Sequence, residues 1–159
     1  MNVRNLCSIS CALALASCSG GHPTNLDFRA TALAPCPSSP NCVSSTATDA
    51  QHAVAPFVLA APSTDAWRAV AGAVAALPRT RIVMNTTNYL HAECRSALLG
   101  FVDDLELHLG VEGKTIGVRS ASRLGYSDMG VNRKRVSDLR LALEQRGIIA
   151  KETDSAETR

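Results

Sequence analysis

The sequence predicts an α+β fold, a two-layer sandwich in which a mainly antiparallel sheet of about five strands carries two helices on one face. Four strand-like segments follow one another between residues 81 and 123, joined by short turns of the kind that connect antiparallel neighbours. One helical pattern precedes these segments and another follows them. Each helix must bury an apolar stripe, so both are expected on the same side of the sheet.

The first predicted elements are a strand and a helix. Residues 54–60 form a short apolar run before Pro62, which indicates a strand. Ser63 is a favoured N-cap type, and the helix that follows it is expected to end at Pro78. Helical spacing is kept by the apolar residues Trp67, Val70, Ala71, Val74 and Leu77.

Four strands and a second helix complete the pattern. The strands are expected over residues 81–86, 88–97, 101–109 and 114–123. Asn132 is a favoured N-cap type, so the last helix is expected to start there and to stop at Gly147. Its apolar face comprises Val136, Leu139 and Leu143.

Alternation assigns the two faces of the central strands. The core side is expected to hold Leu90, Ala92, Cys94, Leu98, Phe101, Leu105, Leu107 and Leu109. Cys94 is therefore predicted to be buried and unpaired. The opposite side carries His91, Glu93, Glu106 and His108. We interpret that row as a solvated charged face, although imidazole and carboxylate groups in this arrangement could also hold a divalent metal.

The turns predict a register. If residues 97–100 form a four-residue hairpin loop, Glu93 lies opposite Asp104 and His91 lies opposite Glu106. If residues 110–113 form the next loop, Asp104 lies opposite Arg119. Asp103 breaks the alternation, because it is a carboxylate on the core side. It needs a cation or several donors there, and Arg133 or Arg135 could supply one.

The segment from Arg119 to Arg135 concentrates positive charge. Its five cations and one acid give about +4, whereas the whole chain carries +2. Two interpretations stay open. Arg119, Arg123, Arg133 and Arg135, with nearby serines and glycine turns, could bind an anion. Alternatively, these arginines pair with Asp103, Asp104, Glu106 and Asp128 and form a structural network.

The N-terminus has the form of a lipoprotein signal. An apolar run from Leu6 to Ala16 leads to Leu15-Ala-Ser-Cys18, a lipobox in form, and the run is too short to span a bilayer. We predict a signal peptide over residues 1–17 and lipidation of Cys18 with acyl chains such as palmitate. An ordinary secretory signal or a short anchor is the alternative. Ser19 rather than Asp follows Cys18, which favours the outer membrane over the inner membrane.

The remaining chain divides into three parts. Residues 18–35 are polar, broken by Gly and Pro, and predicted to be a lipidated tether. Residues 36–150 are long enough for a single α+β domain with one core, and residues 151–159 are predicted to be a disordered tail. The near-neutral charge of the chain gives no reason to expect nucleic acid as a partner.

A disulfide between Cys36 and Cys42 is expected in the oxidising periplasm, since the two thiols flank a turn containing two prolines. The spacing of the cysteines matches no zinc pattern, and no metal or other cofactor is expected. A serine hydrolase has little support because the chain lacks a Gly-x-Ser-x-Gly elbow.

Several motifs resemble those of domain-of-unknown-function family 1499, which occurs in bacterial lipoproteins, other envelope proteins and plastid proteins. They are Cys36-Pro-Ser-Ser-Pro-Asn-Cys-Val-Ser-Ser45, Tyr89-Leu-His-Ala-Glu93, Arg95-Ser96, Gly100-Phe-Val-Asp-Asp-Leu-Glu106, Arg119-Ser-Ala-Ser-Arg-Leu-Gly-Tyr-Ser-Asp128 and Gly130-Val-Asn-Arg-Lys-Arg135. The resemblance covers roughly residues 34–146. It implies a single compact domain in the cell envelope, and no enzymatic activity is established for the family.

We therefore expect a lipid-anchored protein of the outer membrane whose domain faces the periplasm. Its expected role is a non-catalytic binding or structural module, with an anionic small molecule or an envelope component as the partner besides the membrane. The alternative is an envelope hydrolase that uses Asp103, Asp104 or Glu106 as acid or base, with an arginine stabilising an anionic intermediate.

Overall fold

The computed structural model describes residues 32–151 and shows an α+β fold of six strands and two helices. The strands are β1 (Cys42–Ser44), β2 (Phe57–Val58), β3 (Thr80–Asn85), β4 (Tyr89–Arg95), β5 (Val102–Leu109) and β6 (Thr115–Ser122). The helices are α1 (Thr64–Ala75) and α2 (Val131–Gln145). The predicted signal peptide, the lipidation site Cys18, most of the tether and most of the tail lie outside the described residues.

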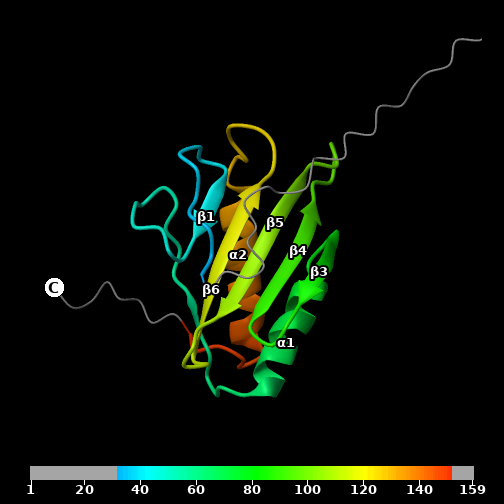
Figure 1. The fold of residues 1–159 in the computed structure, drawn as a ribbon. Helices are drawn as coiled ribbons and strands as arrows, with labels where there is room; N and C mark the ends of the chain where they lie inside the picture. The colour runs from blue at the N-terminus through cyan, green and yellow to red at the C-terminus, as the bar shows by residue number, and fades with distance from the viewer. Residues whose placement is uncertain (1–31, 152–159) are drawn as a thin grey trace, which may run out of the picture.

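The strands form one antiparallel sheet in the order β1-β6-β5-β4-β3, and β2 also pairs with β6. Figure 1 shows both helices behind this sheet, which confirms the predicted two-layer arrangement. We call the side that carries the helices the helix face and the other side the open face. No helix among the described residues is long and apolar enough to span a bilayer.

Helix α1 forms where its capping residue and apolar spacing predict it. Ser63 has an extended backbone, and its hydroxyl oxygen accepts a hydrogen bond from the Ala66 amide at 3.0 Å. Trp67, Val70 and Val74 are buried on the side that faces the sheet. Burying each of these side chains contributes roughly 2 kcal/mol to the free energy of folding.

The N-cap of helix α2 lies two residues earlier than predicted. The N-cap is Gly130, with φ of +81°, and it forms no side-chain capping bond. Asp128 accepts hydrogen bonds from the amides of Gly130 and Asn132 at 3.0 and 2.8 Å. Its carboxylate therefore binds backbone amides at the helix N-terminus that have no partner within the helix. The prediction that Asn132 caps the helix is wrong, because its side chain points into the core instead.

The first hairpin register of the prediction is confirmed and the second is wrong. Glu93 pairs with Asp104 and His91 with Glu106. In the next hairpin Glu106, not Asp104, lies opposite Arg119. The β-turn closes between Gly110 and Gly113, but Gly110 continues the ladder by donating to the Thr115 carbonyl at 2.8 Å. The loop is therefore residues 111–114, and the partner of each β5 residue moves by two positions.

The strand ends differ from the sequence prediction in three places. The apolar run 54–60 supplies only the two-residue strand β2, because Pro56 lacks an amide hydrogen for the ladder. Strand β1 was not predicted, since its three residues are too short to show alternation. Leu98 and Phe101, expected on the core side, are exposed at the β4–β5 turn.

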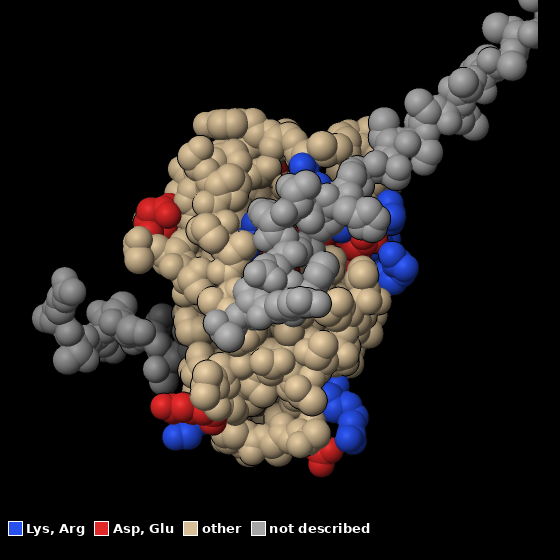
Figure 2. Space-filling model, viewed as in Figure 1, with Lys and Arg blue, Asp and Glu red and all other residues tan. Residues whose placement is uncertain are grey.

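The core lies between the sheet and the helices. Its members come from both layers and include Val70, Val74, Leu90, Leu105, Leu107, Ile116, Val118, Leu139 and Leu143. Cys94 is buried among them and free, as predicted. Figure 2 shows that charged side chains lie mostly along the edges of the visible surface, while its upper end is nearly free of them.

Candidate functional site

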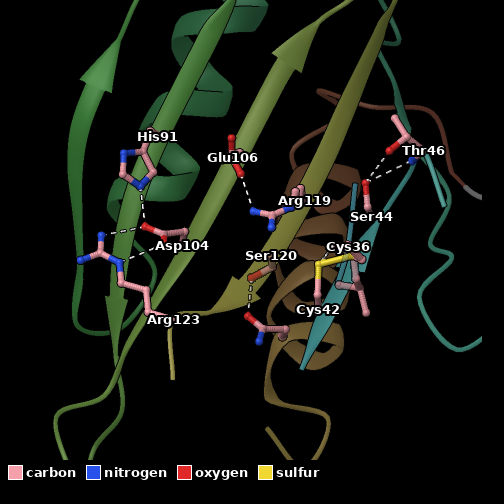
Figure 3. A network of polar contacts seen from close by, with 12 residues as sticks. Cys36, Cys42, Ser44, Thr46, His91, Asp104, Glu106, Arg119, Ser120 and Arg123 are labelled. Atoms are coloured by element: carbon pink, nitrogen blue, oxygen red, sulfur yellow. Dashed lines mark hydrogen bonds and ion pairs between the residues drawn. A yellow bond between two sulfur atoms is a disulfide. The ribbon is translucent and has the colours of Figure 1, made fainter. Parts of the chain in front are cut away.

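The polar residues of the predicted network lie on both faces of the sheet. Asp103 and Asp104 are neighbours in β5, so alternation directs their side chains to opposite faces. Both carboxylates are buried. The sheet thus separates two clusters, a helix-face cluster around Asp103 and an open-face cluster around Asp104 and Glu106. Figure 3 shows Asp104 with His91 and Arg123, and Glu106 with Arg119, in the open-face cluster.

In the helix-face cluster, Asp103 forms an ion pair with an arginine, as its place on the core side requires. The Nη2 of Arg135, in the second turn of α2, donates to Asp103 Oδ2 at 2.6 Å. The Nη1 of the same guanidinium donates to Ser120 Oγ at 2.9 Å. Of the two arginines that the sequence offered, Arg135 neutralises the core-side carboxylate, because α2 packs against β6 and brings this side chain over the end of β5.

Asn132 lies at the centre of the helix-face cluster and is fully buried. Its amide nitrogen donates to the Asn41 carbonyl at 3.0 Å and to Ser122 Oγ at 2.9 Å. Its amide oxygen accepts from Ser120 Oγ at 2.7 Å. One side chain therefore joins α2, β6 and the segment before β1, and each of its polar atoms is satisfied.

A disulfide supports that segment. Cys36 and Cys42 are bonded, with Cα atoms 5.7 Å apart, as predicted. Asn41 precedes Cys42, and its amide nitrogen donates to the Gly125 carbonyl at 2.6 Å. The disulfide closes the loop that precedes β1, and Asn41 connects this segment to the loop before α2.

In the open-face cluster, Asp104 is held by three donors. His91 Nε2 donates to Oδ1 at 2.7 Å, and Arg123 donates through Nε to Oδ2 at 2.9 Å and through Nη2 to Oδ1 at 2.8 Å. The Arg123 Nη2 also reaches Glu93 Oε1 at 2.8 Å. Arg123 follows the last residue of β6, and its fork-shaped guanidinium spans two carboxylates from two strands.

Glu106 forms the second part of the open-face cluster. Arg119 Nη1 donates to Glu106 Oε2 at 2.7 Å, and the Tyr89 hydroxyl donates to Oε1 at 2.8 Å. Arg119 is 2% exposed and is among the largest fully buried side chains of the described chain. A buried guanidinium is costly unless its charge and its hydrogens are matched.

The pKa directions fit this saturated arrangement. Burial raises the pKa of the Asp104 carboxyl, but the hydrogen bonds from His91 and Arg123 outweigh burial and hold the pKa below its ordinary value. Burial also raises the pKa of Glu93, and Arg123 and Arg81 likewise bring it below the ordinary value. The pKa of Tyr89 is raised, first by burial and then by the Glu106 carboxylate. Glu93 and Asp104 are therefore ionised at neutral pH, and Tyr89 is protonated.

Two side chains on the open face each have a buried nitrogen atom without a hydrogen-bond partner among the described residues. These atoms are Arg119 Nε and His108 Nε2. His108 lies opposite Gly117, two residues along β6 from Arg119. The two side chains are thus diagonal neighbours on one face of the sheet.

The segment before β1 borders this part of the open face. A side-chain carbon at Gly117 would lie 3.3 Å from Leu33 Cδ1 and 3.4 Å from Ser45 Oγ. The Ser45 hydroxyl accepts from the Val118 amide at 2.9 Å. The missing side chain of Gly117 therefore allows Leu33, before β1, and Ser45, directly after β1, to approach β6 near Arg119.

Two residues of the predicted network form hydrogen bonds with backbone groups instead of ion pairs with one another. Asp128 accepts from the first amides of α2, as described above. Arg133 donates to the carbonyls of Ala53 and Gln51 at 2.8 and 2.7 Å and fixes the loop before β2. Among the described residues, neither side chain forms an ion pair with a member of the Asp103 or Asp104 cluster.

The expectation of a solvated charged face is wrong. His91 and Glu106 are each 2% exposed, and Tyr89 and Asp104 are also buried. Alternation reveals which face a residue occupies, but it does not reveal how deeply that face is covered. In the described part of the chain, no three residues of the metal-ligating types gather in a group that could hold a metal.

Three members of these clusters were not assigned to the network from the sequence: Tyr89, His91 and Asn132. The predicted register did place Glu93 beside Asp104 and His91 beside Glu106, and alternation could have added Tyr89 to the same face. Asn132 gave no such signal, because its burial depends on the left-handed Gly130 that precedes it.

Comparison with known proteins gives a family. No curated protein and no solved structure matches the chain. One family model matches over residues 32–143, which is most of the chain, and it agrees with the family that the sequence motifs resemble. The chain therefore belongs to the family described as a protein of unknown function, DUF1499.

Proposed function

We propose that this protein is a non-catalytic binding module of the bacterial envelope that receives an anionic group on its open face, at Arg119 and His108. We further propose that lipid on Cys18 holds it at the outer membrane, with the domain in the periplasm. The ligand class is a small molecule or envelope component that presents a carboxylate or phosphate oxygen.

The observation that carries the binding proposal is the unused donor capacity of Arg119. Its Nη1 is engaged by Glu106, whereas the buried Nε–H has no partner among the described residues. An unsatisfied buried donor costs about 1–3 kcal/mol, and more when it is charged. A ligand oxygen that accepts from this group and from an Nε2-protonated His108 would remove that cost.

The carboxylates support binding rather than catalysis. A general acid or base needs a pKa near the working pH and access to the substrate. The pKa of Asp104 is held below its ordinary value, and both of its oxygens accept from His91 or Arg123. Both oxygens of Glu106 are likewise engaged. The alternative of an envelope hydrolase therefore has less support.

Isothermal titration with inorganic phosphate and with acetate tests the binding site. Arg119→Lys keeps a cation for Glu106 but removes the planar Nε–H, so we expect binding to weaken at least about tenfold, the effect of losing one charge-assisted hydrogen bond. Arg81→Lys is the matched control, because Arg81 is an exposed partner of Glu93 on β3. Circular dichroism verifies that both variants are folded.

Equal affinities of the wild type and the Arg119→Lys variant would contradict a site at Arg119. Equal weakening by Arg81→Lys would indicate a general charge effect. Mass spectrometry of small molecules that co-purify with the protein from its native membranes would identify the natural ligand, and that ligand should be depleted in the Arg119→Lys variant.

The anchoring proposal has its own test. Cys18→Ala removes the thiol that carries the lipid, and it should move the protein from the membrane fraction to the soluble periplasmic fraction. Ser17→Ala, which leaves Cys18 in place, is the matched control. A Cys18→Ala variant that stays in the membrane fraction would reject lipid anchoring at this residue.

A further inference from the structure

Exposed apolar side chains gather on two neighbouring loops. Seven of the eleven large apolar residues that are exposed in residues 32–151 belong to these loops. The β4–β5 loop, residues 96–101, presents Leu98, Leu99 and Phe101. The β6–α2 loop, residues 123–130, together with Val131 at the start of α2, presents Leu124, Tyr126, Met129 and Val131. We call these seven residues the apolar end.

The two loops are adjacent in space. Ser96 and Phe101 of one loop and Leu124 and Val131 of the other line a common hollow of about 150 Å³. Both loops lie at the upper end of Figure 1. In Figure 2 the uncovered part of this end shows few charged side chains, and basic side chains lie along the right-hand side of the molecule.

The loops hold their apolar side chains outward on an ordered backbone. Ser96 closes the first loop through its amide, which donates to the Phe101 carbonyl, and through its hydroxyl oxygen, which accepts from the Phe101 amide. In the second loop Met129 has φ of +54°, an unfavourable conformation for a residue with a side chain. Ser127 Oγ accepts from the Met129 amide at 3.2 Å and supports that conformation. Leu98 and Met129 are each 95% exposed as a result.

Basic residues line a second groove, which continues from the apolar end. This groove, of about 440 Å³, is lined by Ser96 and Val131 from the loops and by Arg79, Arg95 and Lys134. The three cations are exposed, and Asp138, the partner of Lys134, is the acid that lines the same groove. The groove therefore has an excess of positive charge directly beside exposed apolar side chains.

From this juxtaposition we infer that the apolar end is a membrane-docking surface. Leu98, Leu99, Tyr126 and Met129 enter the boundary between headgroups and acyl chains, while Arg79, Arg95 and Lys134 bind anionic headgroups. Apolar burial combined with attraction of cations to anionic lipid is the usual basis of interfacial binding.

A membrane fits this end better than a protein partner. Protein interfaces have a closely packed core of complementary shape, usually depleted of charged residues. Here the most exposed apolar side chains project singly from two loop tips, and cations flank them. Projecting side chains can enter a fluid interface, whereas a rigid partner would need a separate pocket for each one.

This inference does not depend on the lipid anchor. If Cys18 is anchored as proposed, the 14 peptide units from Cys18 to Ala32 span at most about 50 Å, so the anchor and the apolar end can bind the same bilayer. The anchor would then raise the effective concentration of the apolar end at the membrane.

Quenching of tryptophan fluorescence by brominated lipids tests the proposal on the full-length protein. Leu98→Trp and Met129→Trp place reporters at the apolar end, and Val111→Trp places one in the fully exposed β5–β6 loop at the other end of the sheet. The protein is reconstituted in vesicles of equal parts phosphatidylcholine and phosphatidylglycerol, brominated in the upper part of the acyl chains. We expect quenching at positions 98 and 129 to exceed that at position 111 by about twofold or more, because only inserted side chains reach the bromines.

The comparison separates docking from anchoring, since a lipid on Cys18 holds all three variants at the vesicle equally. Combining Arg95→Glu with Lys134→Glu should reduce quenching at position 98 in the mixed vesicles and leave it unchanged in pure phosphatidylcholine. Equal quenching at all three positions, or no quenching above that of the native Trp67, would overturn the proposal. So would a concentration-dependent dimer in sedimentation velocity that Met129→Asp dissociates, because a second copy would then cover the apolar end.

Discussion

Asp103 and Asp104 show how two adjacent carboxylates acquire different surroundings. Alternation along β5 sends Asp103 to Arg135 on α2 and Asp104 to Arg123 beyond β6. Each pair is buried, so its geometry matters more than that of a surface pair. The charge concentrated in residues 119–135 is therefore used on both faces of the sheet. Among the described residues, the Nε of Arg119 has no hydrogen-bond partner.

A double-mutant cycle measures the pair between Asp103 and Arg135. Asp103→Asn and Arg135→Gln should each lower the free energy of unfolding by about 2–3 kcal/mol, with a coupling energy of about 1–3 kcal/mol in urea denaturation. The exposed pair of Lys134 and Asp138 on the same helix is the control, and its coupling should stay below about 0.5 kcal/mol. Additive effects at Asp103 and Arg135 would contradict a direct interaction.

Among the elements, α2 depends most on a special backbone conformation. Gly130 at φ of +81° ends the loop and starts the helix, and this start directs Asn132 into the core and Arg135 toward Asp103. No heavy atom lies within 4 Å of where a side-chain carbon at Gly130 would stand. The requirement for glycine is therefore conformational rather than steric.

The same substitution at two glycines tests this conclusion. Gly130→Ala should lower the free energy of unfolding by about 1 kcal/mol, because alanine disfavours the left-handed region. Gly72→Ala, in the interior of α1 with open space around it, should raise the free energy of unfolding by about 0.5–1 kcal/mol. Thermal or urea unfolding gives both values, and effects of equal sign would reject the assignment.

At the scale of the whole molecule, the open-face cluster makes stability depend on pH. The pKa values of Glu93 and Asp104 lie below their ordinary values in the folded protein. A carboxyl group with a lowered folded pKa stabilises the protein fully above its unfolded pKa, near 4, and this contribution disappears as the pH falls through the folded pKa. The domain should therefore lose stability on acidification below about pH 4–5.

Asp104→Asn tests the source of that pH dependence. The variant should be destabilised by about 2 kcal/mol near neutral pH, through the loss of charged hydrogen bonds, and this difference from the wild type should shrink below about pH 4. Asp65→Asn, at an exposed residue of α1, should show a small difference at every pH. Urea unfolding across the pH range provides the measurement. A difference for Asp104→Asn that stays constant with pH would contradict a lowered pKa of Asp104.

Local patterns in the sequence predicted the elements that depend on local physics. Ser63 marked the start of α1, the four-residue turn at 97–100 gave the correct pairing of Glu93 with Asp104, and Cys36 and Cys42 indicated their disulfide. The fold class followed, because alternation and helical spacing leave few ways to bury the apolar positions.

The sequence by itself thus determined the layers, the faces of the strands and the presence of a carboxylate, Asp103, on the core side. Only the tertiary structure decided which cation meets which carboxylate. A register shift of two residues keeps every side chain on its face, so the apolar pattern could not distinguish Arg119 opposite Asp104 from Arg119 opposite Glu106. The burial of the open face and the central place of Asn132 depend on segments far apart in the chain, which no local pattern records.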